Sequence, residues 1–328
     1  MKHLWKGVMA ALVTPMTAAE ELDLDRLGEI VEYLIANGVQ GLAPLGSTGE
    51  YYALTGTERQ AVVRATVAAA AGRVPVVVGA NAGSTREVVA YARQAEALGA
   101  DGVLLGAPYY SLPGPEELFA HFRAVDETLG IPIMLYNYPG RMGVDMTPVL
   151  IERLAELPNV RYVKESTGNL TRVGEILRRT GGRVGVFCGC DTLALESLRE
   201  GAVGWVGGVV NVLPREHVRL FELACEQQDR AGAEQWSERM RPVLSMMEDE
   251  GKYTQLVKAG CALVGHPVGP PRRPLLPPRP EDLRRLGQKL SALGIPAAPA
   301  SDGWSGGGIA ADTVLRLSAS GDGEKGNH

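Results

Sequence analysis

Short apolar runs alternate with amphipathic stretches over the first 228 residues of this 328-residue chain, and this alternation strongly limits the possible folds. The apolar runs are rich in β-branched residues and almost unbroken, which is typical of parallel strands buried on both faces. They begin near residues 8, 41, 75, 102, 133, 160, 184 and 203. Helical patterns follow at residues 24–37, 57–71, 85–98, 115–129, 147–157, 170–179, 192–200 and 214–228. Eight consecutive βα units predict an α/β fold, the (β/α)8 TIM barrel.

A doubly wound parallel sheet is the alternative fold for such a pattern. It would be favoured by a G-x-G-x-x-G sequence after the first strand, and the sequence has none there. Pro15 stands where that turn would be. The barrel is therefore the better interpretation.

The pattern becomes entirely helical after residue 228. Residues 229–264 predict two helices interrupted near Gly251, and a proline-rich connector precedes a last helix at residues 281–293. We therefore expect a barrel at residues 1–228 and a C-terminal helical extension at residues 229–295. Residues 296–328 are rich in Ala, Gly, Ser and Pro, a composition typical of a disordered tail.

The composition excludes several classes of function. With 45% hydrophobic and 22% charged residues, the chain can bury a large core. A formal net charge of -5 without a basic cluster predicts that it does not bind nucleic acid. No apolar run is long enough to span a membrane and the first residues do not resemble a signal peptide, so we expect a cytoplasmic protein.

The cysteines and histidines do not predict a metal site. The four cysteines lack C-x-x-C spacing and a paired framework, so reduced thiols are expected rather than disulfides or zinc ligands. The five histidines are scattered singly along the chain. We therefore expect no metal.

Lys164 is the most informative residue for function. It ends the expected strand that begins at residue 160, and it is the only lysine between Lys6 and Lys252 in a chain with 33 lysines and arginines. Arginine stays protonated, whereas a desolvated lysine can lose its proton and attack a carbonyl carbon. Active sites of βα barrels form where the strands end. We therefore interpret Lys164 as a nucleophile; the alternative is a solvated lysine at a strand end.

Other polar groups follow neighbouring strands and would meet Lys164 at the barrel mouth. These groups are Ser47, Thr48, Tyr109, Tyr110, Tyr136, Arg141 and Gly189 with Cys190 and Asp191. Each has an ordinary structural alternative. Ser47 and Glu50 have the spacing of a helix capping box, the tyrosines could be packing residues, and Arg141 could lie in a surface loop.

Several motifs, in this order and spacing, resemble the dihydrodipicolinate synthase / N-acetylneuraminate lyase family of class I pyruvate aldolases. The resemblance covers roughly residues 7–290. The motifs are Ala11-Leu12-Val13-Thr14-Pro15-Met16, Gly46-Ser47-Thr48-Gly49-Glu50, Pro108-Tyr109-Tyr110, Tyr136-Asn137-Tyr138-Pro139-Gly140-Arg141 and Lys164-Glu165-Ser166-Thr167-Gly168-Asn169. The resemblance implies a barrel that assembles into tetramers built from tight dimers.

The resemblance also implies catalytic roles. Lys164 would form an imine with the ketone of pyruvate or another 2-oxo acid, so the reaction would need no cofactor. Tyr136 would move protons during imine formation and C–C bond formation, and Thr48 would pass protons to Tyr136. Tyr110, supplied by a neighbouring subunit, would complete the relay.

Substrate-binding roles follow from the same resemblance. Ser47 and Thr48 would hold the carboxylate of the 2-oxo acid, and Gly189 and Val206 would line its pocket. Arg141 is a feature of dihydrodipicolinate synthases, in which it meets the carboxylate of aspartate semialdehyde. A planar guanidinium suits such bidentate binding.

The sequence also departs from the synthases. Ser47 stands where they usually have threonine, and residues 251–258 replace their Asn-Pro segment. The leading hypothesis is a Schiff-base lyase, most simply 4-hydroxy-tetrahydrodipicolinate synthase acting on pyruvate and aspartate semialdehyde. The alternatives are an aldolase or dehydratase of 2-keto-3-deoxy sugar acids, sialic acid or hydroxylated 2-oxo acids, and a non-catalytic 2-oxo acid-binding protein.

Overall fold

The apolar runs form one eight-stranded sheet in the computed structural model, which describes residues 5–297. The strands are β1 (Gly7–Ala11), β2 (Gly41–Ala43), β3 (Val77–Gly79), β4 (Gly102–Gly106), β5 (Ile133–Asn137), β6 (Val160–Glu165), β7 (Gly185–Cys188) and β8 (Gly204–Gly207). All named strand pairs are parallel, in the order β2-β1-β8-β7-β6-β5-β4-β3. A parallel bridge between Leu42 and Val76 joins the two ends of the sheet. The predicted (β/α)8 barrel is confirmed.

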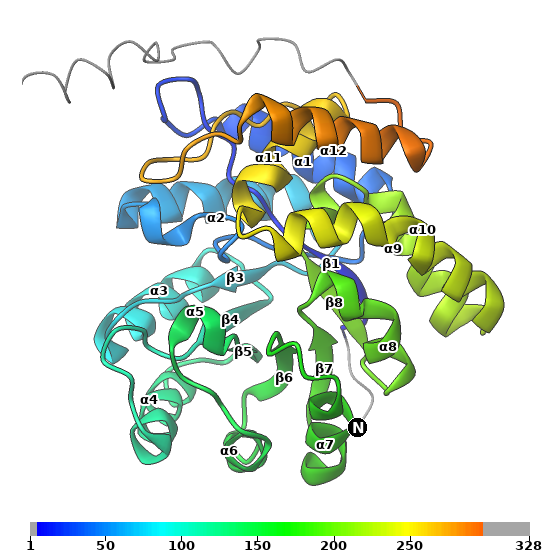
Figure 1. Ribbon diagram of the computed structural model, residues 1–328. Coiled ribbons are helices and arrows are strands. Elements are labelled where there is room, and N and C mark those ends of the chain that lie inside the picture. Colours follow the sequence, from blue (N-terminus) through cyan, green and yellow to red (C-terminus); the bar gives the residue numbers. More distant parts are fainter. Residues whose placement is uncertain (1–4, 298–328) are drawn as a thin grey trace, which may run out of the picture.

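Helices alternate with the strands and surround them (Figure 1). They are α1 (Leu24–Ala36), α2 (Gly56–Ala70), α3 (Thr85–Ala97), α4 (Pro115–Asp126), α6 (Pro148–Leu154), α7 (Thr171–Thr180), α8 (Ala194–Arg199) and α9 (Pro214–Phe221). Side chains cap several N-termini. The Asp23 carboxylate accepts from Arg26 N at 2.9 Å, and Thr55 and Glu58 form a capping box. A cap of this kind contributes about 1 kcal/mol, so the helix starts are specified locally.

Two structural alternatives and one helix bound from the sequence analysis differ from the structure. Thr55 caps α2, so the spacing of Ser47 and Glu50 does not correspond to a cap. Arg141 lies in a short helix, α5 (Pro139–Met142), rather than in a loop. The helix expected over residues 214–228 changes after Phe221 into a π-helical turn, η4 (Glu222–Glu226).

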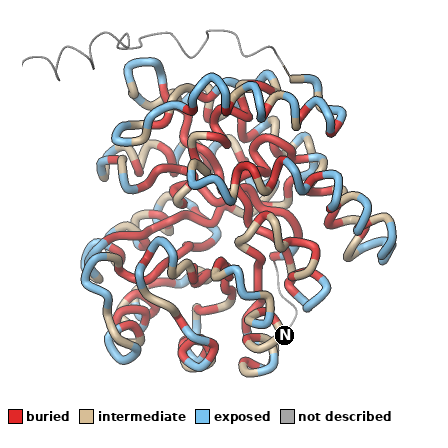
Figure 2. Tube along the Cα trace, in the orientation of Figure 1, coloured by how far each residue is buried: buried red, intermediate tan, exposed pale blue. Residues whose placement is uncertain are grey.

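The core lies inside the barrel and between the strands and the helices around them. Figure 2 shows buried residues along the strands and exposed residues on the outer faces of the helices. Every residue of β4 and β5 is buried, and Phe187 and Trp205 have no exposed surface. Burial of one large apolar side chain contributes about 1.5–3 kcal/mol. This core fixes the strand register, which in turn sets the positions of the residues at the strand ends.

Three helices follow the barrel in the region where the sequence predicts them. They are α10 (Arg230–Asp249), α11 (Tyr253–Leu263) and α12 (Pro280–Ala292). α11 packs against α10, α12 and the short turn η3 (Val209–Asn211) that follows β8. The predicted disordered tail lies almost wholly outside the described residues, since residues 298–328 are not described.

A buried ion pair joins α11 to the loop after β2. Lys258 Nζ lies 2.8 Å from Glu50 Oε1 and donates to the carbonyl oxygens of Thr14 at 3.0 Å and Pro270 at 2.7 Å. The other Glu50 oxygen accepts from Arg272 N at 2.7 Å. Neither charged side chain of the pair is exposed to solvent. The loop that carries Ser47 and Thr48 is therefore fastened to the C-terminal extension.

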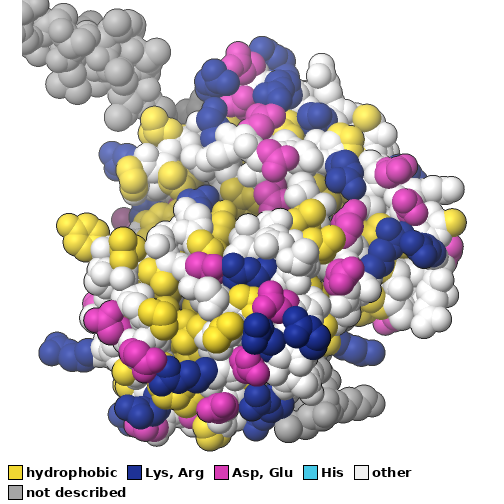
Figure 3. Space-filling model, turned by 60° about the horizontal axis from the view of Figure 1, so that its bottom comes forward, with side chains coloured by type: hydrophobic (Ala, Val, Ile, Leu, Met, Phe, Trp, Pro, Cys, Tyr) yellow, Lys and Arg dark blue, Asp and Glu magenta, His cyan; other side chains and the backbone are white. Residues whose placement is uncertain are grey.

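The described residues show neither a membrane-spanning helix nor a ready metal site. Within residues 5–297, no helix has the length and apolar character needed to cross a bilayer. Over the same range, no group of three His, Cys, Asp or Glu side chains is placed to hold a metal ion. On the face shown in Figure 3, acidic and basic side chains are interspersed, so this face has no single-sign patch.

Candidate active site

Lys164 lies near the end of β6 with its side chain inside the barrel. The residue is 6% exposed, and its Nζ atom lies 4.4 Å from the centre of the Tyr136 ring on the adjacent strand β5. Burial lowers the pKa of the Lys164 amine, and the negative charge of Asp191 opposes this shift. Among the hydrogen bonds and salt bridges of the described residues, none involves this amine. The neutral, nucleophilic form is therefore favoured relative to a surface lysine.

The second buried lysine has a different environment. Lys258 Nζ has three oxygen partners, one of them the Glu50 carboxylate, and an ammonium group has three hydrogens to donate. Its donors are all used by the protein. Lys258 is therefore a structural cation, whereas Lys164 is available for chemistry.

Tyr136 and Ser47 lie beside the amine. Tyr136 is 4% exposed, and burial raises the pKa of its phenol, whereas a hydrogen bond with the Ser47 side chain opposes the shift. The phenol is therefore protonated at neutral pH and can donate to a nearby oxygen. Ser47 comes from the loop after β2. Gly49 is required there, because a Cβ atom at this position would lie 2.9 Å from the Leu12 carbonyl oxygen.

A cavity at the barrel mouth brings most of the predicted site residues together. Its walls include the predicted residues Ser47, Thr48, Tyr136, Arg141, Lys164, Gly189 and Val206. Cys190, which the sequence also predicts at the barrel mouth, lines the cavity too. The walls also include residues that the sequence interpretation did not assign to the site: Tyr138, Ser166, Gly208, Glu248, Gly251, Tyr253 and Thr254. Four of the latter come from α10, α11 and the turn between them. The helical extension therefore forms part of the cavity wall.

Tyr110 is the predicted catalytic residue that does not line this cavity. Its side chain is 97% exposed, on the segment after β4, and its backbone is left-handed with φ 73°. Leu112 nearby is 57% exposed and also has a positive φ, 49°. Within a single copy of the chain, Tyr110 therefore lies on the surface, outside the cavity.

Arg141 supplies the guanidinium of the cavity. It lies over the Tyr138 ring at 5.9 Å from its centre. Burial opposes the charge of the guanidinium, but the Tyr138, Tyr136 and Tyr52 phenols outweigh burial and raise its pKa. In the described part of the chain its electrostatic neighbours are tyrosines rather than carboxylates. The positive charge is therefore free to meet an anionic ligand.

Gly189 and Ser166 form a tight contact with the lysine. A Cβ atom at Gly189 would lie 1.9 Å from Ser166 Oγ and 2.9 Å from Lys164 Cε, so the position requires glycine. Ser166 Oγ is buried without a hydrogen-bond partner among the described residues. An unpaired buried hydroxyl costs about 1–3 kcal/mol. A polar ligand in the cavity would satisfy it.

Asp191, whose negative charge acts on the Lys164 amine, lies close to a second carboxylate, Glu248. Asp191 is 2% exposed, and burial together with the nearby Glu248 charge raises its pKa to about 7. The Glu248 carboxylate accepts from the backbone N–H groups of Asp191 at 3.1 Å and Thr192 at 2.7 Å. No motif or spacing in the sequence points to Glu248, because it comes from α10, far along the chain.

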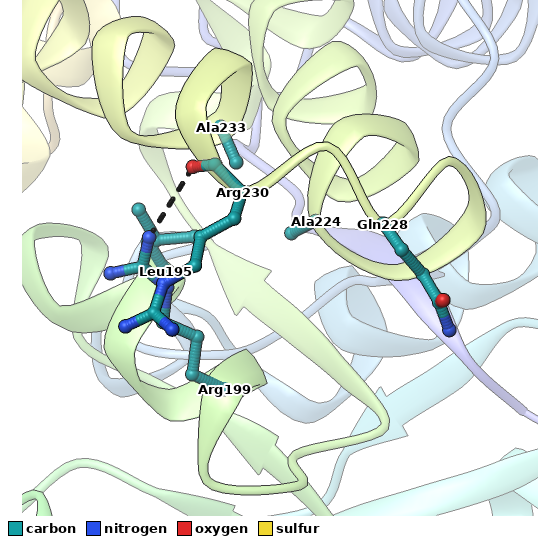
Figure 4. Close-up of a pocket in the computed structure, with 6 residues that line it drawn as sticks. All are labelled: Leu195, Arg199, Ala224, Gln228, Arg230 and Ala233. Atoms are coloured by element: carbon teal, nitrogen blue, oxygen red, sulfur yellow. Dashed lines mark hydrogen bonds between the residues drawn. The ribbon is translucent and has the colours of Figure 1, made fainter.

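A second hollow lies away from these residues. Figure 4 shows its lining between α8 and the start of α10: Leu195, Arg199, Ala224, Gln228, Arg230 and Ala233. Arg199 Nη2 donates to the Arg230 carbonyl oxygen at 3.5 Å and lies 3.4 Å from the Glu234 carboxylate. No nucleophilic side chain lines this hollow. The barrel mouth is therefore the candidate active site.

Comparisons with known proteins find matches over most of the chain. Residues 4–293 match the model of the dihydrodipicolinate synthetase family. The chain is 37% identical over 280 residues to 4-hydroxy-tetrahydrodipicolinate synthase 1 of Halalkalibacterium halodurans, covering 85% of this chain and 94% of that protein. It is 42% identical over 248 residues to the 4-hydroxy-tetrahydrodipicolinate synthase of Halorhodospira halophila, covering 74% and 82%.

A solved structure is also similar to the chain over most of its length. The chloride-inhibited dihydrodipicolinate synthase of Acinetobacter baumannii, complexed with pyruvate, superposes with a TM-score of 0.85 at 31% identity. The match covers 88% of this chain and 99% of that chain. The similarity therefore extends over the barrel and the C-terminal helices.

Proposed function

Because the chain belongs to the dihydrodipicolinate synthetase family, we propose that it is a class I lyase that binds pyruvate or another 2-oxo acid as an imine on Lys164. The observation that carries this proposal is the buried Lys164 amine, which lies against Tyr136 without a carboxylate partner of its own. The most direct reaction is that of 4-hydroxy-tetrahydrodipicolinate synthase, which uses pyruvate and aspartate semialdehyde.

In the first step, the neutral amine attacks the ketone carbon of pyruvate. The carbonyl oxygen takes up two protons and leaves as water, and the nitrogen and carbon are left joined as an imine. Tyr136, whose ring centre lies 4.4 Å from the amine, supplies a proton to that oxygen, while Ser47 and Thr48 hold the carboxylate. General acid catalysis of this kind contributes about 10²–10⁴-fold.

In the second step, the imine withdraws electrons from the neighbouring methyl group. Loss of one methyl proton gives an enamine, whose carbon attacks the aldehyde carbon of the acceptor. The aldehyde oxygen takes up a proton and becomes a hydroxyl. The amine of aspartate semialdehyde then adds to the imine carbon, which closes the ring and releases Lys164 as a free amine.

Arg141 fits the acceptor better than the pyruvate. It lines the cavity from α5, and its guanidinium can bind a carboxylate through two parallel hydrogen bonds. We assign it to the distal carboxylate of the acceptor, which makes aspartate semialdehyde the preferred aldehyde.

Tyr110 enters the mechanism through assembly. We propose a cytoplasmic homotetramer, a dimer of tight dimers, in which Tyr110 of one copy reaches the site of its neighbour and completes the relay through Thr48 and Tyr136. The exposed Tyr110 and Leu112 side chains support this proposal, because two large apolar groups on one segment suit an interface.

Reductive trapping tests the proposed function. Borohydride with pyruvate should add one covalent adduct to the protein, and peptide mass mapping should place it on Lys164. The Lys164→Ala variant should show no adduct, whereas Lys6→Ala, which removes an exposed lysine, should be trapped like the wild type. An adduct that persists in Lys164→Ala would contradict the assignment of the nucleophile.

A further inference from the structure

Tyr253, the first residue of α11, has its hydroxyl fixed inside the cavity by two hydrogen bonds. The hydroxyl accepts from Gly208 N at 2.8 Å and donates to Oδ2 of Asp191. The other Asp191 oxygen accepts from Trp205 Nε1 at 2.9 Å. The protein itself satisfies both oxygens of this buried carboxylate, so Asp191 orients Tyr253.

Two consecutive glycines let this pair approach the end of β8. A Cβ atom at Gly207 would lie 2.1 Å from Asp191 Oδ1, and one at Gly208 would lie 2.6 Å from Cε1 of Tyr253. Both distances are far shorter than van der Waals contact, so the close approach requires glycine. The same Cβ atom at Gly208 would lie 2.9 Å from Thr48 Oγ1. The tyrosine ring therefore occupies space next to the proposed carboxylate-binding loop.

The charges around the cavity favour one orientation of an anionic acceptor. Asp191 and Glu248 lie on the side of Tyr253, and a carboxylate would be repelled there. Arg141 comes from α5, after β5, and has no carboxylate partner among the described residues. An acceptor with a terminal carboxylate is therefore drawn towards Arg141 and away from Tyr253.

We propose that Tyr253 determines the length of the second substrate, an inference that rests on the function proposed above. The ring, held by Asp191 and Gly208, closes the cavity on the side of α11. The site therefore takes a short aldehyde with a terminal carboxylate that reaches Arg141. It excludes longer polyhydroxylated aldehydes, which need the volume that the ring fills.

Acceptor selectivity tests this inference. With pyruvate as the donor, kcat/KM is measured for aspartate semialdehyde and for arabinose, a longer polyhydroxylated aldehyde. Tyr253→Ser should raise the kcat/KM for arabinose, relative to the kcat/KM for aspartate semialdehyde, at least about tenfold. The reason is that it opens the cavity wall on the side of α11. Tyr253→Phe keeps the ring and should keep arabinose excluded. A Tyr253→Ser ratio equal to that of the wild type would overturn the inference.

Two controls separate the possible causes of a failure. Tyr33→Ser removes a partly buried tyrosine that stacks on His266 at 3.8 Å and does not line the cavity, so its ratio should equal that of the wild type. Borohydride trapping with pyruvate shows whether each variant has a folded site. If Tyr253→Ser gives no adduct, Tyr253→Leu is used in its place. A wild type without an adduct contradicts the proposed function and this inference together. A trapped variant with unchanged selectivity contradicts this inference alone.

Discussion

Lys258 and Glu50 form an ion pair with an Nζ–Oε1 distance of 2.8 Å, and neither side chain has any exposed surface. The pair joins α11 to the loop after β2, so it links the helical extension to the proposed carboxylate-binding residues. It therefore connects the two parts of the chain that line the cavity.

Removal of one partner of this pair should destabilise the protein strongly. Lys258→Met leaves the buried Glu50 carboxylate without its cation, and we expect a loss of about 3–5 kcal/mol in the free energy of unfolding. The double variant with Glu50→Gln should recover part of this loss, because the uncompensated charge is gone. Urea unfolding followed by circular dichroism measures both. Arg285→Ala, which breaks the surface pair with Glu250, is the control and should unfold at nearly the wild-type midpoint.

Imine formation should depend on the lowered pKa of Lys164. Because burial favours the neutral amine, the rate of adduct formation with pyruvate should reach half its maximum at a pH below 10.5, the usual lysine pKa. Quenched borohydride trapping at a series of pH values measures this rate. A half-maximum at or above pH 10.5 would contradict the assigned environment.

The lowered pKa of Lys164 also affects the free energy of unfolding. Between the folded-state pKa and 10.5, the unfolded chain holds more protons at Lys164 than the folded chain, so stability rises with pH in that window. Lys164→Met removes this penalty. It should be more stable than the wild type at pH 7, and the difference should shrink as the pH approaches 10.5. A difference that stays constant with pH would mean that the amine is not desolvated.

Gly189→Ala should disable the site without touching the lysine itself. The new Cβ atom would lie 1.9 Å from Ser166 Oγ and 2.9 Å from Lys164 Cε, so both groups must move. Misplacement of a reacting group by about 1 Å costs about 100-fold in rate. Steady-state kinetics and trapping measure the loss. The control is Gly28→Ala in α1, where a Cβ atom meets nothing within 4 Å, and this variant should retain wild-type kinetics.

Arg141→Ala should separate the two substrates. If the guanidinium binds the acceptor, kcat/KM for aspartate semialdehyde should fall by about 100-fold or more, whereas trapping with pyruvate should stay near the wild-type rate. Arg141→Lys should recover little activity, because an ammonium group cannot make the bidentate contact. Equal losses in both assays would assign Arg141 to the pyruvate carboxylate or to structure.

The fold could be predicted closely because its signals are local. The unbroken apolar runs predict every strand start within two residues of its observed position, as at Gly41 and Val77. Helix caps and glycines act within one turn, so the helix bounds were also nearly correct. The exceptions depend on tertiary contacts. Glu50 has the right spacing for a cap, yet it pairs with Lys258, which lies far along the chain.

Part of the candidate site can be predicted for the same reason. The βα pattern indicates which residues follow the strands, and Lys164, Tyr136 and Arg141, predicted in this way, line one cavity. Glu248 and Tyr253 could not be found in this way. They lie on helices outside the βα repeat, and only the packing of α10 and α11 brings them to the cavity.

Gly207 and Gly208, at the end of β8, restrict which side chains can stand at two positions far along the chain. Because Gly208 accommodates the Tyr253 ring and Gly207 accommodates Asp191, a side chain gained at either glycine is incompatible with the present partner. These positions can therefore change only together, and a substitution tolerated in one relative would be deleterious in another. Swapping single residues between relatives would then mislead, whereas exchanging the β8 end and the start of α11 as one unit would transfer the acceptor preference.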